Sequence, residues 1–448
     1  MCIKLIALFN VAMLTVLIVC VESAFYKITI AASVVLVSYI VFTISLKRSI
    51  AQYMHIALLA VVMFFVSLEV VFRVFPAAIP SGLKVFMYVH ENEGLRQRIV
   101  EYLPDCPFVK FKPNVEARSQ LYRGTPEQFV YDWQTDSLGF KNPLSLDIQS
   151  VQVLALGDSF TEGMGVPTEM TWPGRLTALG VSTYNMGVQG YAPTQAKCTL
   201  KVYGELFSPK VVVFGYTGTI ADRNTGFLPD RGTPSEEERE RALDSVISNE
   251  REIRYTTTQA TTAFFLLVNK VYKYGLGNGM FSNVTLDNPA FNIYLAELLD
   301  LETETVIPFE QSAAWKATLS DFEDVQAWSL KHGARMALVY FPHRAISYYP
   351  SLMKKPLPTA LRELEEARIL SNFCREKGII FVNMTPVFHK YMADLPAKPA
   401  FADLPYLQLD GHMSAKGCTL TALALRDALS RADNVGVEGA LTKAQSRP

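Results

Sequence analysis

Four short, strongly apolar runs between residues 151 and 382 constrain the fold of this chain more than any other feature. Each run is bounded by turn residues, and long helical stretches lie between the runs. The runs are Val151–Leu156, Val211–Tyr216, Met336–Phe341 and Ile379–Val382, and the helical stretches include Thr171–Leu179, Trp315–His332 and Ala360–Lys377. A chain that alternates buried strands with helices forms a parallel sheet covered by helices on both faces. We therefore predict an α/β fold with a three-layer α/β/α domain.

Three longer apolar runs, Leu5–Val21, Ile28–Leu46 and Ile56–Phe75, precede this pattern. Each is long enough to cross about 30 Å of hydrocarbon as a helix. Buried core helices are the alternative, but three such runs in succession favour membrane spans. We predict a membrane anchor with three transmembrane helices over residues 1–76.

The basic residues around these runs predict their orientation. Lys4 precedes the first run and Lys47 and Arg48 follow the second, so the positive-inside rule places the N-terminus and the second loop in the cytoplasm. The first run could instead be a cleaved signal peptide. In both cases everything after Phe75 is predicted to be extracytoplasmic.

The remainder of the chain divides into four predicted segments. Residues 77–149 form a connecting region, 150–432 form the α/β domain, 227–312 interrupt that domain as a cap insertion, and 433–448 are a polar tail. The insertion begins with a charged helical stretch at residues 235–251, although a disordered excursion is the alternative.

Composition excludes several functional classes. The net charge of −1 gives no reason to expect a nucleic acid partner. No phosphate-binding loop, dinucleotide-binding glycine pattern or metal-binding Cys/His spacing is present, so we predict no cofactor and no metal. The cysteines of the exported part are compatible with one disulfide or with isolated thiols, and they are Cys106, Cys198, Cys374 and Cys418.

Two segments predict nucleophilic catalysis. The run Val151–Leu156 leads into Gly157-Asp158-Ser159, and Asp410-Gly411-His412 follows some 250 residues later. A serine hydroxyl becomes a useful nucleophile when a histidine accepts its proton and an acid orients that histidine. We expect Ser159, His412 and Asp410 to meet at the carboxyl edge of the sheet.

The segment Gly157-Asp158-Ser159-Phe160-Thr161-Glu162-Gly163 resembles the first block of the SGNH/GDSL hydrolase superfamily, and the resemblance extends over roughly Leu138–Leu429. Asn185-Met186-Gly187-Val188-Gln189-Gly190 resembles the second block. The resemblance implies that the backbone N–H groups of Ser159 and Gly190 stabilise an oxyanion. Asp136-Ser137-Leu138-Gly139-Phe140 is similar to a stretch that often precedes this domain in proteins from surface-polysaccharide loci.

The third block departs from the family pattern. Thr219 stands where the family carries an oxyanion-binding Asn, and Asn224 follows five residues later. A lost oxyanion donor costs about 10²–10³ in rate. Either Thr219 contributes its hydroxyl, or this copy of the site is weakened or put to another use.

The last block implies that His412 is the general base and Asp410 its orienting acid, although the commoner family spacing is Asp-x-x-His. Asp403 is the alternative acid. Asp158, Asn224, His343 and Arg344 are further candidates for contact with substrate; His343 and Arg344 could bind an anionic or polyol group, or belong to a solvated loop.

These patterns predict a bacterial inner-membrane protein, similar to membrane-anchored esterases and O-acetyltransferases of surface polysaccharides. We expect a serine-dependent hydrolase or acyltransferase acting on an exported carbohydrate ester, with the lipid bilayer and an acylated glycan as partners. A transferase would need a membrane partner that supplies the acyl donor. The alternatives are a lipid or other acyl-ester hydrolase and a non-catalytic glycan-binding or assembly protein.

Overall fold

The computed structural model describes residues 98–103, 106–121, 129–227, 301, 308–396, 399–407 and 411–445, together with positions 50, 53, 55 and 64. The three predicted spans lie almost entirely outside these residues, as does nearly all of the predicted cap insertion. No helix among the described residues is both long and apolar enough to cross a membrane. The chain divides into two compact units, Met1–Phe75 with Thr262–Phe264, and the remainder. The fold and the candidate site described here belong to the second unit.

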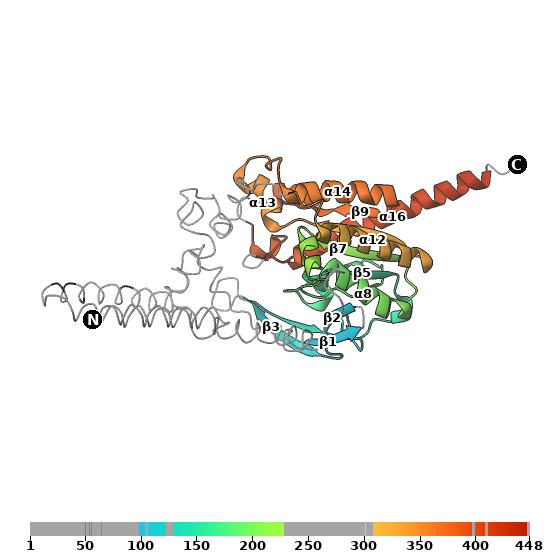
Figure 1. The fold of residues 1–448 in the computed structure, drawn as a ribbon, viewed down its shortest axis with the longest axis horizontal. Helices are drawn as coiled ribbons and strands as arrows, with labels where there is room; N and C mark the ends of the chain where they lie inside the picture. Colours follow the sequence, from blue (N-terminus) through green and yellow to red (C-terminus); the bar gives the residue numbers. More distant parts are fainter. Residues whose placement is uncertain are drawn as a thin grey trace, which may run out of the picture. The chain divides into compact units, whose positions relative to one another are not determined.

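A five-stranded parallel sheet is the centre of this unit (Figure 1), which confirms the predicted α/β fold. Its strand order is β6-β5-β7-β8-β9. The strands are β5 (Val153–Leu156), β6 (Thr183–Asn185), β7 (Val211–Thr217), β8 (Arg335–Phe341) and β9 (Ile380–Asn383). The first strand in the sequence therefore lies between the second and the third. In such sheets ligands bind at the carboxyl ends of the strands, where the strand order reverses.

Helices cover both faces of the sheet. One face packs against α8 (Pro193–Tyr203), α12 (Ala313–Lys331) and α14 (Arg362–Lys377). The other packs against α7 (Trp172–Ala178), α13 (Arg344–Met353), α15 (Met384–Ala393) and α16 (Ala415–Gln445). Helix α16 continues through most of the segment predicted as a polar tail.

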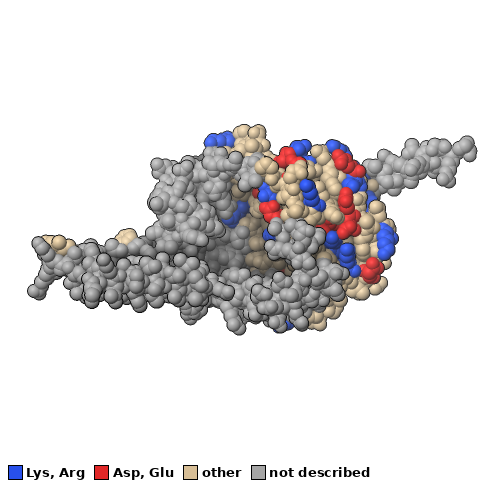
Figure 2. All heavy atoms as spheres, in the orientation of Figure 1, with Lys and Arg blue, Asp and Glu red and all other residues tan. Residues whose placement is uncertain are grey.

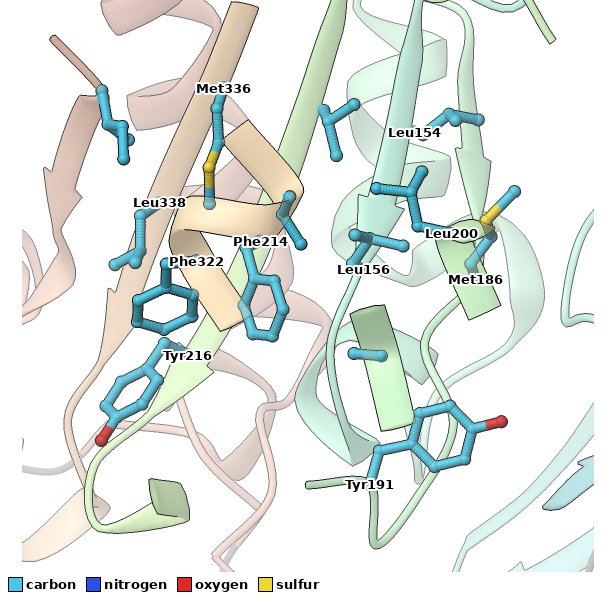
Figure 3. Packing of buried hydrophobic residues seen from close by; sticks show 14 of the residues in the cluster. Leu154, Leu156, Met186, Tyr191, Leu200, Phe214, Tyr216, Phe322, Met336 and Leu338 are labelled. Carbon is cyan, nitrogen blue, oxygen red and sulfur yellow. The ribbon is translucent and has the colours of Figure 1, made fainter. Parts of the chain in front are cut away.

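Two hydrophobic cores lie on opposite faces of the sheet because side chains alternate along each strand. Leu154 and Leu156 of β5 face the first core, with Phe214 and Tyr216 of β7 (Figure 3). Phe322 of α12 packs against this row, with its ring centroid 5.0 Å from that of Phe214. The intervening residues, such as Val153 and Val213, face the second core. Strands buried on both faces are continuously apolar, which explains the runs in the sequence.

Two antiparallel hairpins precede the sheet, in the region predicted as a connection. The strands are β1 (Arg98–Leu103), β2 (Cys106–Phe111), β3 (Glu116–Leu121) and β4 (Phe129–Gln134). Gly165 donates its N–H to the Tyr131 hydroxyl at 3.2 Å, and Lys110 donates to the Tyr203 hydroxyl of α8 at 2.8 Å. The hairpins are thus hydrogen-bonded to the α/β domain.

The segment that follows the hairpins ties β6 to the rest of the domain. Asp136 accepts hydrogen bonds from the N–H groups of Leu138 and Phe140, and from the Asn142 side chain. Asn142 in turn pairs with the backbone of Asn185, accepting its N–H at 2.8 Å and donating to its carbonyl at 3.0 Å. This segment has a structural function, because it fixes the end of β6 from which the second block departs.

The described surface carries charges of both signs. On the face shown in Figure 2, basic and acidic side chains are interspersed. Such a surface agrees with the small net charge of the chain.

Three of the four cysteines after the predicted anchor have a defined state. Cys198 of α8 is disulfide-bonded. Cys374 and Cys418 are free and buried. A disulfide therefore forms part of this fold, and the two free thiols behave as small core residues.

Candidate active site

Ser159 lies at the first position of α6 (Ser159–Glu162), directly after the turn that ends β5. Gly157 makes this turn possible, since a Cβ at that position would lie 2.7 Å from the Gly215 carbonyl oxygen and 2.3 Å from Thr161 Oγ1. Its φ of +148° is also a conformation that favours glycine. The turn therefore places the serine at the carboxyl edge of the sheet.

Asp158 holds this turn and does not line the cavity around Ser159. Its side chain is buried and accepts hydrogen bonds from the Phe160 N–H at 3.0 Å and the Thr217 hydroxyl at 3.2 Å. Arg223 Nη1 lies 3.1 Å from its second oxygen. The carboxylate is fully used within the protein, so a structural role replaces the substrate contact predicted for it.

His412 lies beside Ser159, as the motifs predicted. His412 Nε2 is 2.9 Å from Ser159 Oγ, and the Phe160 ring packs against the imidazole with 5.5 Å between centroids. This is the arrangement that lets a histidine accept a serine proton. Phe160 covers one side of the pair with an apolar ring.

The loop that carries His412 is fixed on both sides. Leu407 donates its N–H to the His412 carbonyl at 2.7 Å, within a bridge between Tyr406 and Met413. Ser414 caps α16 by accepting the N–H groups of Lys416 and Gly417. Its hydroxyl also donates to the Leu404 carbonyl. The position of the imidazole is therefore set by a strand-like bridge before it and a helix cap after it.

Of the two candidate acids, Asp403 lies within the described residues and Asp410 does not. Asp410 lies outside the described residues, so its role remains a prediction. Asp403 ends the 3₁₀ helix Phe401–Asp403, where its carbonyl accepts the Tyr391 hydroxyl at 2.8 Å. It is not among the residues that line the cavity at Ser159.

The second block lies against the first. Val188 donates its N–H to the Gly157 carbonyl at 3.2 Å, and Gln189 donates its N–H to Glu162 at 2.5 Å. The Tyr191 N–H closes a turn onto the Val188 carbonyl, with Gly190 at φ +83°. This is the position in a type II turn that favours glycine. Within the described residues, the N–H groups of Ser159 and Gly190 donate no hydrogen bond, and both remain candidate oxyanion donors.

Thr219 uses its backbone N–H within the protein. With φ +65° it adopts a left-handed conformation that is rare for a β-branched residue. Its N–H donates to Glu366 Oε2 at 2.8 Å, so only its hydroxyl could serve an oxyanion. Thr219 is among the residues that line the cavity.

Glu366 is fully buried and held by several donors. Arg362 donates to it at 2.9 Å and the Tyr216 hydroxyl at 3.3 Å. Burial raises the pKa of Glu366, while the Thr219 N–H and the Arg362 guanidinium lower it. The residue was not found from the sequence because it shares no motif with Thr219.

Asn224 is a core residue and not a substrate contact. Its amide nitrogen donates to Thr318 and Asp321, each at 3.0 Å, and its oxygen accepts the Thr194 N–H at 3.1 Å. The side chain is fully buried and does not line the cavity. The substrate contact predicted for Asn224 is therefore replaced by a structural role between α8 and α12.

A cavity of about 510 Å³ surrounds the Ser159–His412 pair. His343 and Arg344, both candidates from the sequence, line it. His343 donates its backbone N–H to Glu363 at 2.9 Å, and its Nδ1 lies 2.6 Å from the same carboxylate. Arg344 is buried beside Gly411 and lies 3.5 Å from the Leu407 carbonyl. The full described lining is Ser159, Phe160, Thr217, Gly218, Thr219, Ile220, Arg223, His343, Arg344, Ala345, Gly411 and His412.

Arg223 lines the same cavity, although no sequence motif identified it as a candidate. It lies on the 3₁₀ helix Ile220–Phe227 after β7. Only its proximity to the third block could have suggested it. Among the described residues, no group of His, Cys, Asp and Glu is arranged to hold a metal ion.

No protein-family model matches the chain, and no curated protein matches it. Several solved structures do. A protein proposed to be an acylhydrolase from Bacteroides fragilis shares 14% identity, over 64% of this chain and 92% of its own, with a TM-score of 0.31. A proposed lipolytic protein of the G-D-S-L family from Desulfitobacterium hafniense shares 14% identity, over 62% and 99%, with a TM-score of 0.30. A carbohydrate acetylesterase family member from Sinorhizobium meliloti shares 13% identity, over 62% and 97%, with a TM-score of 0.26.

Proposed function

We propose that this chain is a serine-dependent acyl-ester hydrolase or O-acyltransferase of the SGNH/GDSL kind. The observation that supports this proposal most strongly is the 2.9 Å separation between Ser159 Oγ and His412 Nε2 in a cavity large enough for a small ester. Two residues 253 positions apart in the sequence meet with the geometry that nucleophilic catalysis requires.

The proposed reaction has two acyl-transfer steps. Ser159 Oγ attacks the ester carbonyl carbon while its proton passes to His412 Nε2. The tetrahedral intermediate collapses, and His412 returns the proton to the departing alkoxide, which leaves an acyl-serine. Water or a sugar hydroxyl then attacks the acyl carbon, with His412 accepting its proton and returning it to Ser159 Oγ. Asp410 is proposed to orient His412.

The oxyanion of each intermediate needs hydrogen-bond donors that are already in place. We assign this role to the N–H groups of Ser159 and Gly190. The Thr219 hydroxyl is a third donor in place of the amide that the family pattern carries there. The hydrogen bonds from Val188 and Gln189 to the first block support the placement of the Gly190 turn near the nucleophile.

The substrate we propose is a carbohydrate ester on the extracytoplasmic side of a bacterial inner membrane. The three N-terminal apolar runs support this location, and so do the positions of the basic residues that flank them. The disulfide at Cys198 supports it independently, since disulfides persist in oxidising compartments. A transferase at this location requires a membrane partner that supplies the acyl donor.

The test is hydrolysis of p-nitrophenyl acetate by the purified full-length chain in detergent. We expect Ser159→Ala and His412→Ala to abolish hydrolysis, whereas Ser150→Ala, which alters an exposed serine, should leave it unchanged. A fluorophosphonate probe should label the wild type and not Ser159→Ala. Labelling that persists in Ser159→Ala would refute the assignment of the nucleophile.

One observation favours a second candidate, a glycan-binding protein without turnover. Thr219 replaces the expected amide donor, and its backbone N–H is occupied by Glu366. Under this alternative, Ser159→Ala would bind acetylated glycans as tightly as the wild type, and neither protein would release acetate.

A further inference from the structure

Among the described residues that line the cavity, none is acidic. Arg223 and Arg344 line it together with two histidines, His343 and His412, and no carboxylate is among these lining residues. Asp158 contacts Arg223 and Glu363 contacts His343, but neither acid is among the described lining residues. An ester that enters this cavity therefore meets guanidinium groups next to the nucleophile.

We propose that the substrate carries a carboxylate on the acylated unit, as in an acylated acidic sugar, and that Arg223 binds this carboxylate. The inference rests on the proposed function and narrows its substrate class. Neutral sugar esters would then be poorer substrates than acidic ones.

The hydrogen bonds of Arg223 leave one side of its guanidinium available. Nη1 lies 3.1 Å from Asp158 and 3.1 Å from the Tyr191 carbonyl. Within the described residues, Nε and Nη2 donate no hydrogen bond, and the side chain is 44% exposed. Nε and Nη2 form the edge of a guanidinium that matches the two oxygens of a carboxylate. Because Nη1 is held in place, this edge is fixed before a ligand binds.

The position of Arg223 also places the bound carboxylate relative to the ester. Its partner Asp158 immediately precedes Ser159, and its other partner Tyr191 follows Gly190 of the proposed oxyanion hole. A carboxylate on Arg223 would therefore lie close to the ester carbonyl. This is compatible with an acyl group and a carboxylate on the same sugar ring.

Arg344 adds to the electrostatic preference without needing direct contact. It is buried, so its charge is less screened by solvent than that of an exposed arginine.

The experiment compares acetate release from a triacetylated methyl glucuronoside and from its neutral methyl ester, using the full-length chain. We expect the wild type to prefer the carboxylate substrate by about tenfold or more in kcat/KM, the range of a charge-assisted pair. Arg223→Met should remove most of this preference and Arg223→Lys should retain part of it. Arg118→Met alters an exposed arginine on β3 and should change neither rate.

Direct binding separates this inference from the proposed function. The Ser159→Ala chain should bind the glucuronoside at least tenfold more tightly than its methyl ester in calorimetry, and Ser159→Ala/Arg223→Met should not. This result would support the inference even if the wild type released no acetate, an outcome that would count against the proposed function alone.

Three results would overturn the inference. The first is equal binding of the acid and its methyl ester, or no binding of either. The second is an equal loss of both rates in Arg223→Met, which would assign Arg223 to holding Asp158 only. The third is competition by glucose 6-phosphate but not by glucuronate, since a guanidinium edge also matches phosphate.

Discussion

The backbone N–H of Thr219 donates to the buried carboxylate of Glu366, 147 residues later, at 2.8 Å. This hydrogen bond holds a β-branched residue in the left-handed region at the edge of the cavity. Because this N–H is bound to Glu366, it is not available to stabilise an oxyanion in the cavity. The shape of the third block is thus determined by α14, an element outside every motif.

Glu366→Leu should destabilise the domain by about 3 kcal/mol, because it leaves the Thr219 N–H and Arg362 without their buried acceptor. Glu366→Gln keeps a carbonyl oxygen for the Thr219 N–H and should cost less. Urea unfolding of the two variants measures the difference. Equal destabilisation of both would show that charge, and not acceptance of the Thr219 N–H, is what matters.

Gly157→Ala should remove esterase activity and lower the unfolding free energy by at least about 2 kcal/mol more than Gly180→Ala does. Both glycines have positive φ, but a Cβ at Gly157 meets the Gly215 carbonyl at 2.7 Å whereas one at Gly180 meets nothing within 4 Å. The pair therefore separates steric contact from backbone strain. Thermal unfolding and p-nitrophenyl acetate hydrolysis are the measurements, and equal effects of the two substitutions would contradict the argument.

Lys141 should make stability rise with pH above about 8. Its ammonium group is buried and donates to the carbonyls of Gly163 and Val166, each at 2.7 Å. Burial lowers the pKa of Lys141 to about 8 from its ordinary 10.5, against the opposing effect of Glu162. Between these values the unfolded chain binds more protons than the folded one, so the unfolding free energy increases with pH.

The measurement is urea unfolding of the wild type and of Lys141→Met between pH 7 and 10. Other titrating groups cancel in the difference between the two proteins. The wild type should gain up to about 3 kcal/mol relative to the variant over this range, and a constant difference would contradict the prediction.

The free cysteines should be alkylated only after unfolding, and the disulfide-bonded Cys198 only after reduction. Cys374 and Cys418 are buried, and burial raises the pKa of each thiol to about 12, so neither should react with a thiol reagent in the native protein at pH 7.5. Reduction of the Cys198 disulfide should lower stability by about 2–4 kcal/mol. Mass spectrometry after alkylation under native and denaturing conditions checks both statements.

The elements that could be predicted from the sequence are those marked by a continuous apolar run within a single short segment. Strand β7 is buried along its whole length, so its apolar run was visible, as were those of β5, β8 and β9. Strand β6 has only three residues, two of them polar, and was absent from the predicted runs. The hairpins were also missed as such, because β3 is largely polar.

The same distinction applies to the candidate site. Ser159 and His412 were found because each lies in a short motif. Arg223 and Glu366 act through partners 65 and 147 residues away, and no local pattern relates such residues. Asp158 and Asn224 were identified as special residues, but their partners, which only the fold reveals, assign them to the support of the site.

The separation of 253 positions between Ser159 and His412 has a consequence for biosynthesis. A nascent chain exposes Ser159, the proposed nucleophile, long before His412, the proposed base, is synthesised, and the two can meet only after β7, β8 and β9 have joined the sheet. Contacts between distant residues form late in folding. An incompletely made or partly folded chain would therefore have no working site, and hydrolysis would begin only when the last helix has docked.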